Sequence, residues 1–127
     1  MEEPYDKYSR KAYESTLRGD YTKALEYWDK VLDIHTNSTA KKGKADTCYK
    51  AEMYEEAIDL YRQCLSRGLY LPDAYTYSDI GRCLISLERF SEALGEFQNA
   101  LDVIYEYFDR REDRDEPDTV EDRKSVV

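Results

Sequence analysis

The sequence predicts an all-α array of three helix pairs, and three observations support that prediction. Three segments of the 127-residue chain share a pattern in which aromatic residues stand three positions before and four positions after an alanine. The alanines are Ala24, Ala57 and Ala93, so the segments follow one another at spacings of 33 and 36 residues. Each alanine also lies in an apolar stripe of helical period, which a leucine closes eight positions later. Repeats of this length build elongated stacks of helical units.

The first helix pair is expected at residues 5–18 and 21–34. Pro4 suits the opening turn of the first helix, and Gly19-Asp20 ends it. The second helix has apolar residues at the three- and four-residue spacings of one helical face. These residues are Tyr21, Ala24, Leu25, Trp28, Val31 and Leu32. The small alanine lets two helices approach closely at that point.

The second and third pairs repeat this arrangement. Residues 39–51 are expected to form a helix capped by Asn37-Ser38, and residues 74–87 one that starts at Pro72-Asp73 with Asp73 as its cap. The apolar stripes of the partner helices are Tyr54, Ala57, Ile58, Tyr61, Cys64 and Leu65, and Phe90, Ala93, Leu94, Phe97, Ala100 and Leu101.

The apolar pattern ends after Ile104. Residues 105–127 contain nine acidic and five basic residues, a pattern typical of a solvated helix stabilised by spaced opposite charges. Pro117 is expected to end that helix and to leave a frayed tail. The sequence therefore predicts a repeat domain at 1–104, with repeats at about 5–36, 38–70 and 74–106, and a charged helical extension at 105–127.

The composition excludes several classes of function. The chain has 28 acidic and 19 basic residues and a net charge of −9, which disfavours binding to nucleic acid or to anionic membranes. No apolar run approaches the roughly 18 residues of a membrane-spanning helix. The start Met1–Pro4 carries two acidic residues and does not resemble a signal peptide, so we expect a cytoplasmic protein.

The sequence contains no recognisable catalytic or metal-binding set. Cys48, Cys64 and Cys83 are widely spaced on predicted apolar helix faces, so we expect buried, reduced thiols. His35 is the only histidine and has no cysteine or carboxylate at ligand spacing. We therefore expect no enzyme activity, cofactor or metal ion.

Three motifs in one register carry a family resemblance. They are G-D-Y-x-x-A-L-x-x-W from Gly19, Y-x-x-A-I-x-x-Y from Tyr54 and F-x-x-A-L-x-x-F from Phe90, together with the first-helix pair Ile80-Gly81 and its small equivalents Ala12 and Ala45. On these residues, the chain from about residue 5 to residue 104 resembles the tetratricopeptide repeat (TPR) family. The resemblance implies a right-handed solenoid of three helix-turn-helix repeats followed by a C-terminal helical extension. Its first helices would line a concave groove that binds peptides or partner proteins.

The register of the family assigns the groove residues. They would be Asp6, Ser9, Tyr13, Thr16, Lys42, Asp46, Tyr49, Lys50, Tyr75, Ser78, Arg82 and Ile85, and all except Asp6, Thr16 and Ile85 form the predicted binding set. Adaptors of heat-shock chaperones in this family clamp a terminal carboxylate with lysine, arginine and asparagine, because a carboxylate needs convergent cationic and amide donors. The corresponding residues here are Ser9, Tyr13, Gly43, Tyr75 and Asp79, so such a clamp is not expected.

The tyrosines of the groove allow two interpretations. Tyrosine is enriched at protein interfaces, so Tyr13, Tyr49 and Tyr75 could contact a partner, or they could pack between neighbouring first helices. Nearby Lys42 and Arg82, with Lys50, would favour a partner segment with apolar and acidic side chains.

The sequence therefore predicts a non-enzymatic protein–protein adaptor. One alternative is a small acidic chaperone for a specific client protein. A second is a self-assembling scaffold subunit, a weak homo-oligomer formed through an open apolar face of the Ile80/Leu84 type beyond the third repeat, which is covered only if residues 105–114 bend back. A separate hypothesis has the acids at 113, 115, 116 and 118 folding over Lys42, Lys50 and Arg82.

Overall fold

The computed structural model describes residues 2–66 and 68–115, with the side chains of the last helix described up to Arg110. All six elements in these ranges are α-helices, which confirms the all-α prediction. They are α1 (Pro4–Leu17), α2 (Tyr21–Ile34), α3 (Ser38–Lys50), α4 (Tyr54–Cys64), α5 (Asp73–Ser86) and α6 (Phe90–Asp115). Within these residues, no helix is both long and apolar enough to cross a membrane.

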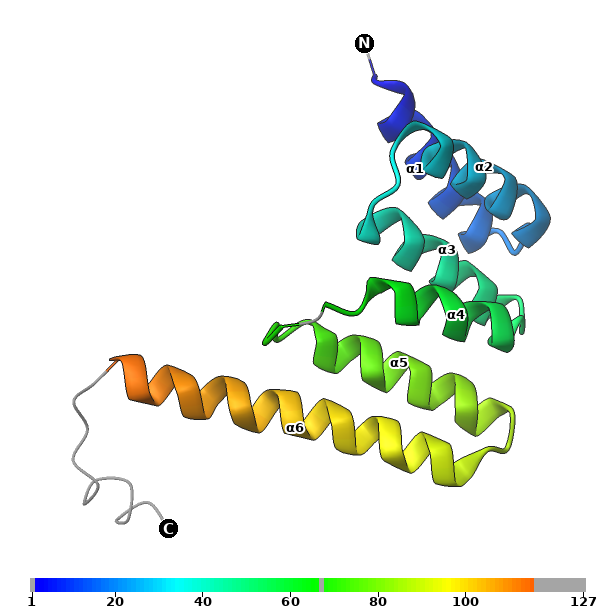
Figure 1. Cartoon of the computed structure of the whole chain (residues 1–127). Helices are drawn as coiled ribbons and strands as arrows, with labels where there is room; N and C mark the ends of the chain where they lie inside the picture. Colours follow the sequence, from blue (N-terminus) through cyan, green and yellow to red (C-terminus); the bar gives the residue numbers. More distant parts are fainter. Residues whose placement is uncertain (1, 67, 116–127) are drawn as a thin grey trace.

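The helices form a stack of antiparallel pairs that follows the chain order. The main contacts join α1 to α2, α3 to α4 and α5 to α6, and α2–α3 and α4–α5 contacts connect successive pairs. Figure 1 shows α1 and α2 at one end of the stack and α6 at the other. The architecture is therefore an all-helical, repeat-like array in which each pair packs on its neighbours.

The turn inside each pair has the same backbone geometry. Gly19, Glu52 and Glu88 stand at equivalent positions, and all three adopt the left-handed conformation, with φ of 80°, 63° and 59°. In each turn, the amide of this residue donates to the carbonyl three residues before it, and the next amide donates to the carbonyl five residues before its own position. This Schellman pattern satisfies the free carbonyls at the helix end. The sequence repeat is thus also a backbone repeat.

The repeated alanines lie at the centre of the packing. Ala24 and Ala57 are fully buried and Ala93 is 2% exposed, which confirms the close helix contacts predicted at these positions. One core cluster combines α3, α4 and α5 through residues such as Cys48, Tyr61 and Ile80. A second cluster joins the first pair to α3.

Trp28 anchors the first pair to the second. Its indole nitrogen donates to the hydroxyl of Thr47 at 2.9 Å, and that hydroxyl also bonds to Thr16 at 3.0 Å. Gly43 lies directly against the Trp28 ring, where an added Cβ would overlap ring carbons. Thr16 is consequently buried between α1 and α3, so its assignment to the groove is wrong.

The helix starts follow the predictions with one exception. The Asn37 side chain accepts from the amide of Ala40 at 2.7 Å and caps α3, as predicted. Asp73 was expected to cap α5, but Pro72 occupies that position and Asp73 is the first helical residue. The buried carboxylate of Asp73 instead accepts from the amide and hydroxyl of Ser66, at 3.2 and 2.6 Å. Asp73 therefore ties Ser66, which follows α4, to the first turn of α5.

Helix α6 is one continuous helix. It runs antiparallel to α5, and its C-terminal part extends well beyond the end at which α5 begins (Figure 1). Residues 105–114 continue its line instead of bending back. Ile80 and Leu84, the residues predicted for the open face beyond the third repeat, are buried in the cluster between α4 and α5, so that assignment of residues is wrong. The predicted helix end at Pro117, the frayed tail and the folding back of the acidic tail lie outside the residues and side chains that the structure describes.

Candidate functional site

The predicted groove residues lie on α1, α3 and α5 and differ in how accessible they are. Tyr13 is 51% and Tyr75 69% exposed, and Lys50 and Arg82 are also exposed. The remaining members of the set are half-buried: Ser9, Lys42, Asp46, Tyr49 and Ser78. Outside this set, Asp6 and Ile85 are exposed. Apart from Thr16, the predicted groove residues therefore present side chains at the surface of the three first helices.

The tyrosines combine packing with exposure. Tyr13 places its ring edge-on against Trp28, with ring centroids 5.0 Å apart, and still exposes half of its surface. Tyr49 packs edge-on against Tyr54, at 5.6 Å, and borders the core. The sequence allowed partner contact or packing between neighbouring first helices. The structure instead shows Tyr13 and Tyr49 packed against second helices, on Trp28 of α2 and Tyr54 of α4, with half of the Tyr13 surface exposed.

Two carboxylates lie in the middle of this surface. The Tyr61 hydroxyl donates to Asp46, and Arg82 forms an ion pair with Asp79. Burial raises the pKa of Asp46 above its usual value, although the hydrogen bond from Tyr61 and the nearby charges of Lys42 and Lys50 oppose that shift. Burial and the Asp46 charge likewise raise the pKa of Tyr13. The contacts between α1 and α3, which include the hydrogen bond between the Thr16 and Thr47 hydroxyls, bring these two first helices together.

Arg82 links α5 to α3. Its guanidinium lies 5.5 Å from the centroid of the Tyr49 ring, an arrangement typical of a cation–π contact. Because Asp79 already neutralises Arg82, the cationic side chains left for a ligand are Lys42 and Lys50. The predicted cationic cluster is therefore smaller than the sequence suggested.

A cavity of about 290 Å³ lies where the first-helix surface meets the end of the array. It is lined by Leu71, Ala74, Tyr75, Ser78, Ile104 and Phe108. The predicted residues Tyr75 and Ser78 thus share a cavity with the second half of α6. The charge pattern after residue 104 predicted a solvated extension and gave no indication of a cavity beside Phe108.

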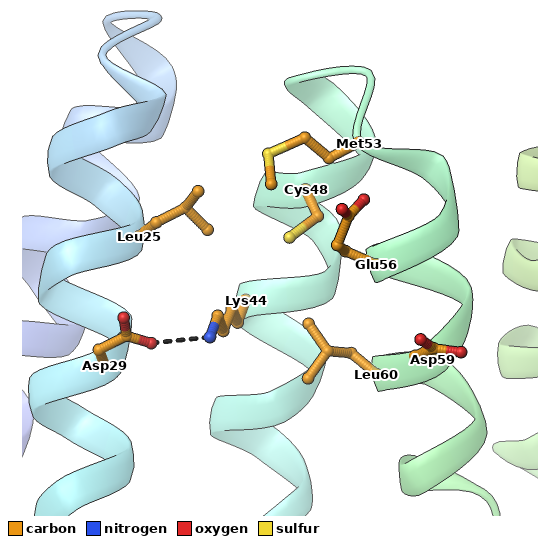
Figure 2. Close-up of a pocket in the computed structure, with 8 residues that line it drawn as sticks. All are labelled: Leu25, Asp29, Lys44, Cys48, Met53, Glu56, Asp59 and Leu60. Carbon is orange, nitrogen blue, oxygen red and sulfur yellow. Dashed lines mark hydrogen bonds and ion pairs between the residues drawn. The ribbon is translucent and has the colours of Figure 1, made fainter.

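A second cavity, of about 360 Å³, lies between α2, α3 and α4 and was not predicted. Figure 2 shows Leu25, Cys48 and Leu60 around it, with Lys44 bonded to Asp29 at 2.7 Å across its edge. Met53, Glu56 and Asp59 complete the lining. The carboxylates of Asp29, Glu56 and Asp59 at its edge do not suit the partner segment with apolar and acidic side chains that the sequence suggested.

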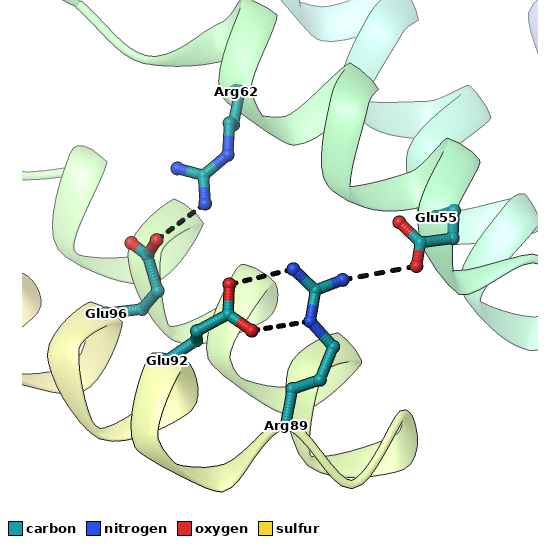
Figure 3. A network of polar contacts seen from close by, with 5 residues as sticks. All are labelled: Glu55, Arg62, Arg89, Glu92 and Glu96. Atoms are coloured by element: carbon teal, nitrogen blue, oxygen red, sulfur yellow. Dashed lines mark hydrogen bonds and ion pairs between the residues drawn. The ribbon is translucent and has the colours of Figure 1, made fainter.

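Ion pairs connect α4 to α6 and to Arg89, the residue directly before α6. Figure 3 shows Arg62 bonded to Glu96 at 2.7 Å and Arg89 bonded to both Glu92 and Glu55. Glu96 is 8% exposed, so Arg62 is the partner that makes its burial tolerable. This network stabilises the packing of the third pair on the second.

The described residues contain no group of three or more potential metal ligands among histidine, cysteine, aspartate and glutamate. The three cysteines are free thiols, as predicted, but only Cys48 and Cys83 are buried, whereas Cys64 is half-buried near the end of α4. Burial raises the pKa of all three thiols, that of Cys83 to about 11. Such thiols are poor nucleophiles at neutral pH.

Comparison with protein-family models and with curated proteins gives no match.

Proposed function

We propose that this protein is a TPR-type adaptor that binds a peptide or protein segment along the surface of α1, α3 and α5. The three motifs in one register and the repeated left-handed turns support the family assignment. In a TPR solenoid these first helices line the concave groove.

The observation that carries the proposal is the continuity of this surface across three repeats. Helix α1 contacts α3 directly, and the Tyr49 ring on α3 lies 5.5 Å from the guanidinium of Arg82 on α5. Half-exposed tyrosines beside Lys42 and Lys50 suit an extended segment with apolar and acidic side chains. Tyrosine rings contribute contact area at a low cost in side-chain entropy, which favours binding over a shallow surface.

A pair of exposed residues allows this proposal to be tested with little effect on the core. The groove variant combines Tyr13→Ser with Lys50→Glu, and the control variant combines Ile34→Ser with Lys23→Glu on α2. Both variants replace one exposed apolar residue and reverse one exposed lysine. Tyr49 is left intact because it is half-buried and borders the core. Tyr13→Ser also removes a ring contact with Trp28, so thermal unfolding is measured to show that the groove variant is as stable as the control.

Each protein is immobilised and used to capture binding partners from a lysate of its native source. We expect the wild type and the control variant to retain the same protein and the groove variant to lose it. Titration of the identified protein should then show at least tenfold weaker binding by the groove variant. Equal retention by the groove variant, with helicity unchanged by circular dichroism, would refute the proposal.

A further inference from the structure

Helix α6 exposes a row of large apolar side chains. Phe90, Leu94, Leu101, Tyr105 and Phe108 are between 44% and 71% exposed. At 3.6 residues per turn, their positions fall within an arc of about 60°, and the row is about 27 Å long. With about 150–250 Å² for a whole aromatic side chain, the row offers on the order of 500 Å² of apolar surface. We call these five residues the α6 stripe.

The equivalent residues in the inner repeats are covered by the next helix pair. Leu25 on α2 packs against the cluster that contains Cys48 of α3, and Ile58 on α4 is 6% exposed in the cluster with Ile80 of α5. Leu94 occupies the same position in the third repeat and is 71% exposed. The α6 stripe therefore has the composition of a face that is covered by a helix elsewhere in this array.

The opposite end of the array has a different character. The register assigns Lys7, Arg10, Lys11 and Glu14 of α1 to the positions at which α3 meets α2. Arg10 forms ion pairs with Glu2 and Glu14, at 3.1 and 3.0 Å. This charged face is a poor match for the α6 stripe of a second molecule, so head-to-tail stacking of copies is not favoured.

Charge on the free edge of the α6 stripe indicates the kind of partner. Asp102 and Asp109 lie beside Leu101 and Tyr105 on the helix surface, about 40–60° from Tyr105, and both are exposed. The described side chains of α6 include a single basic one, Arg110. It lies on the side of the helix away from the α6 stripe and pairs with Glu106 at 2.7 Å. A second copy would bring the same acidic edge and a net charge of −9. Basic side chains on the partner would complement this edge.

We propose that the α6 stripe binds an amphipathic helix of another protein, with an apolar face flanked by lysine or arginine, in the place that a further first helix would take. The cavity lined by Tyr75, Ile104 and Phe108 at the border of the stripe accepts one large apolar side chain of that helix. This is the helix-in-groove mode of recognition, in which apolar anchors at helical spacing provide affinity and flanking charge provides selectivity.

Two synthetic 18-residue peptides serve as probes. Both have leucine at the three- and four-residue spacings of one helix face, and the other positions are lysine in one peptide and glutamate in the other. Binding to the full chain is measured by fluorescence anisotropy at about 150 mM salt, close to physiological ionic strength. We expect the leucine–lysine peptide to bind at least tenfold more tightly than the leucine–glutamate peptide.

Three variants separate the α6 stripe from general attraction to an acidic protein. Leu94→Gln with Leu101→Gln keeps the charge and the helix propensity and should weaken binding of the lysine peptide at least tenfold. The same substitutions at Leu17 and Ile34, which are also exposed, should leave binding unchanged. Asp102→Asn with Asp109→Asn should weaken binding of the lysine peptide severalfold.

Equal affinity for the two peptides would overturn the proposal, and so would equal loss of binding in the stripe variant and the Leu17/Ile34 control. Sedimentation velocity tests whether a second copy of this chain covers the α6 stripe instead. A wild-type dimer that becomes a monomer in the stripe variant would identify that second copy and overturn the proposal. The groove variant Tyr13→Ser/Lys50→Glu should retain peptide binding, so the adaptor proposal and this one can fail separately.

Discussion

Glutamates in left-handed turns are expected to limit the stability of this array. Glu52 and Glu88 adopt φ of 63° and 59° at the position where the first repeat has Gly19. A residue with a Cβ pays about 1–2 kcal/mol in this conformation, and the larger entropy of glycine in the unfolded chain offsets part of the gain from replacing it. We therefore expect Glu52→Gly and Glu88→Gly each to raise the free energy of unfolding by about 0.5–1 kcal/mol.

Urea denaturation followed by circular dichroism measures this effect. The two substitutions lie in separate turns and should add, giving about 1–2 kcal/mol in the double variant. Glu26→Gly is the matched control, because it removes the same charge from the exposed middle of α2 and should cost about 1 kcal/mol. Glu52→Gln, which removes the charge but keeps a Cβ, should change little. A loss of stability in both turn variants would refute the role assigned to these turns.

Further predictions concern close packing and the buried tyrosine. Gly43→Ala should lower the free energy of unfolding by about 2 kcal/mol in thermal unfolding, since its Cβ would overlap Trp28, whereas Gly95→Ala, with open space around it, should raise it by about 1 kcal/mol. Tyr61→Phe should lower the free energy of unfolding by about 1–3 kcal/mol in urea denaturation, because the Asp46 carboxylate loses its donor. Adding Asp46→Asn to that variant should restore part of the loss. Burial, with donation to Asp46, raises the pKa of Tyr61, so the folded state keeps a proton that the unfolded state releases. Stability should therefore fall as the pH rises above about 10, and less steeply in Tyr61→Phe.

The fold class and most helix boundaries could be predicted because apolar periodicity reports burial directly. The contacts between helices are closest at Ala24, Ala57 and Ala93, where only a small side chain fits. The burial of these alanines could therefore be predicted from the apolar pattern. The cap at Asn37 was also predictable, since its side chain acts within three residues along the chain. Signals of this kind depend on local geometry and require no knowledge of tertiary contacts.

Residues whose role depends on distant partners could not be assigned. Asp73 looks like a helix cap in the sequence, but its carboxylate bonds to Ser66 across a loop. The repeat register assigns Thr16 to the groove, but its side chain is buried and bonds to the hydroxyl of Thr47 on α3. Leu94 and Leu101 have the pattern of buried residues and are exposed, because the periodicity of a helix does not tell whether another helix follows to cover it.

The exposure of the proposed groove residues was predicted in part. The register placed Tyr13, Lys50 and Tyr75 at the surface, where the structure has them. It also counted Arg82 as an unneutralised cation, although Asp79, one turn earlier on the same helix, pairs with it. Phe108 lines the cavity beside Tyr75 because α6 continues unbroken past residue 104. The charge pattern alone does not predict whether that helix is continuous.

The stacking of consecutive helix pairs has a consequence for folding kinetics. Because the main contacts join helices that are neighbours in the chain, the relative contact order is low, and proteins of this kind fold within microseconds to milliseconds. The middle pair, α3 and α4, has a neighbour on both sides, whereas α1 and α6 each end the stack. Amide hydrogens of the middle pair should therefore exchange most slowly, and exchange should quicken towards both ends of the array.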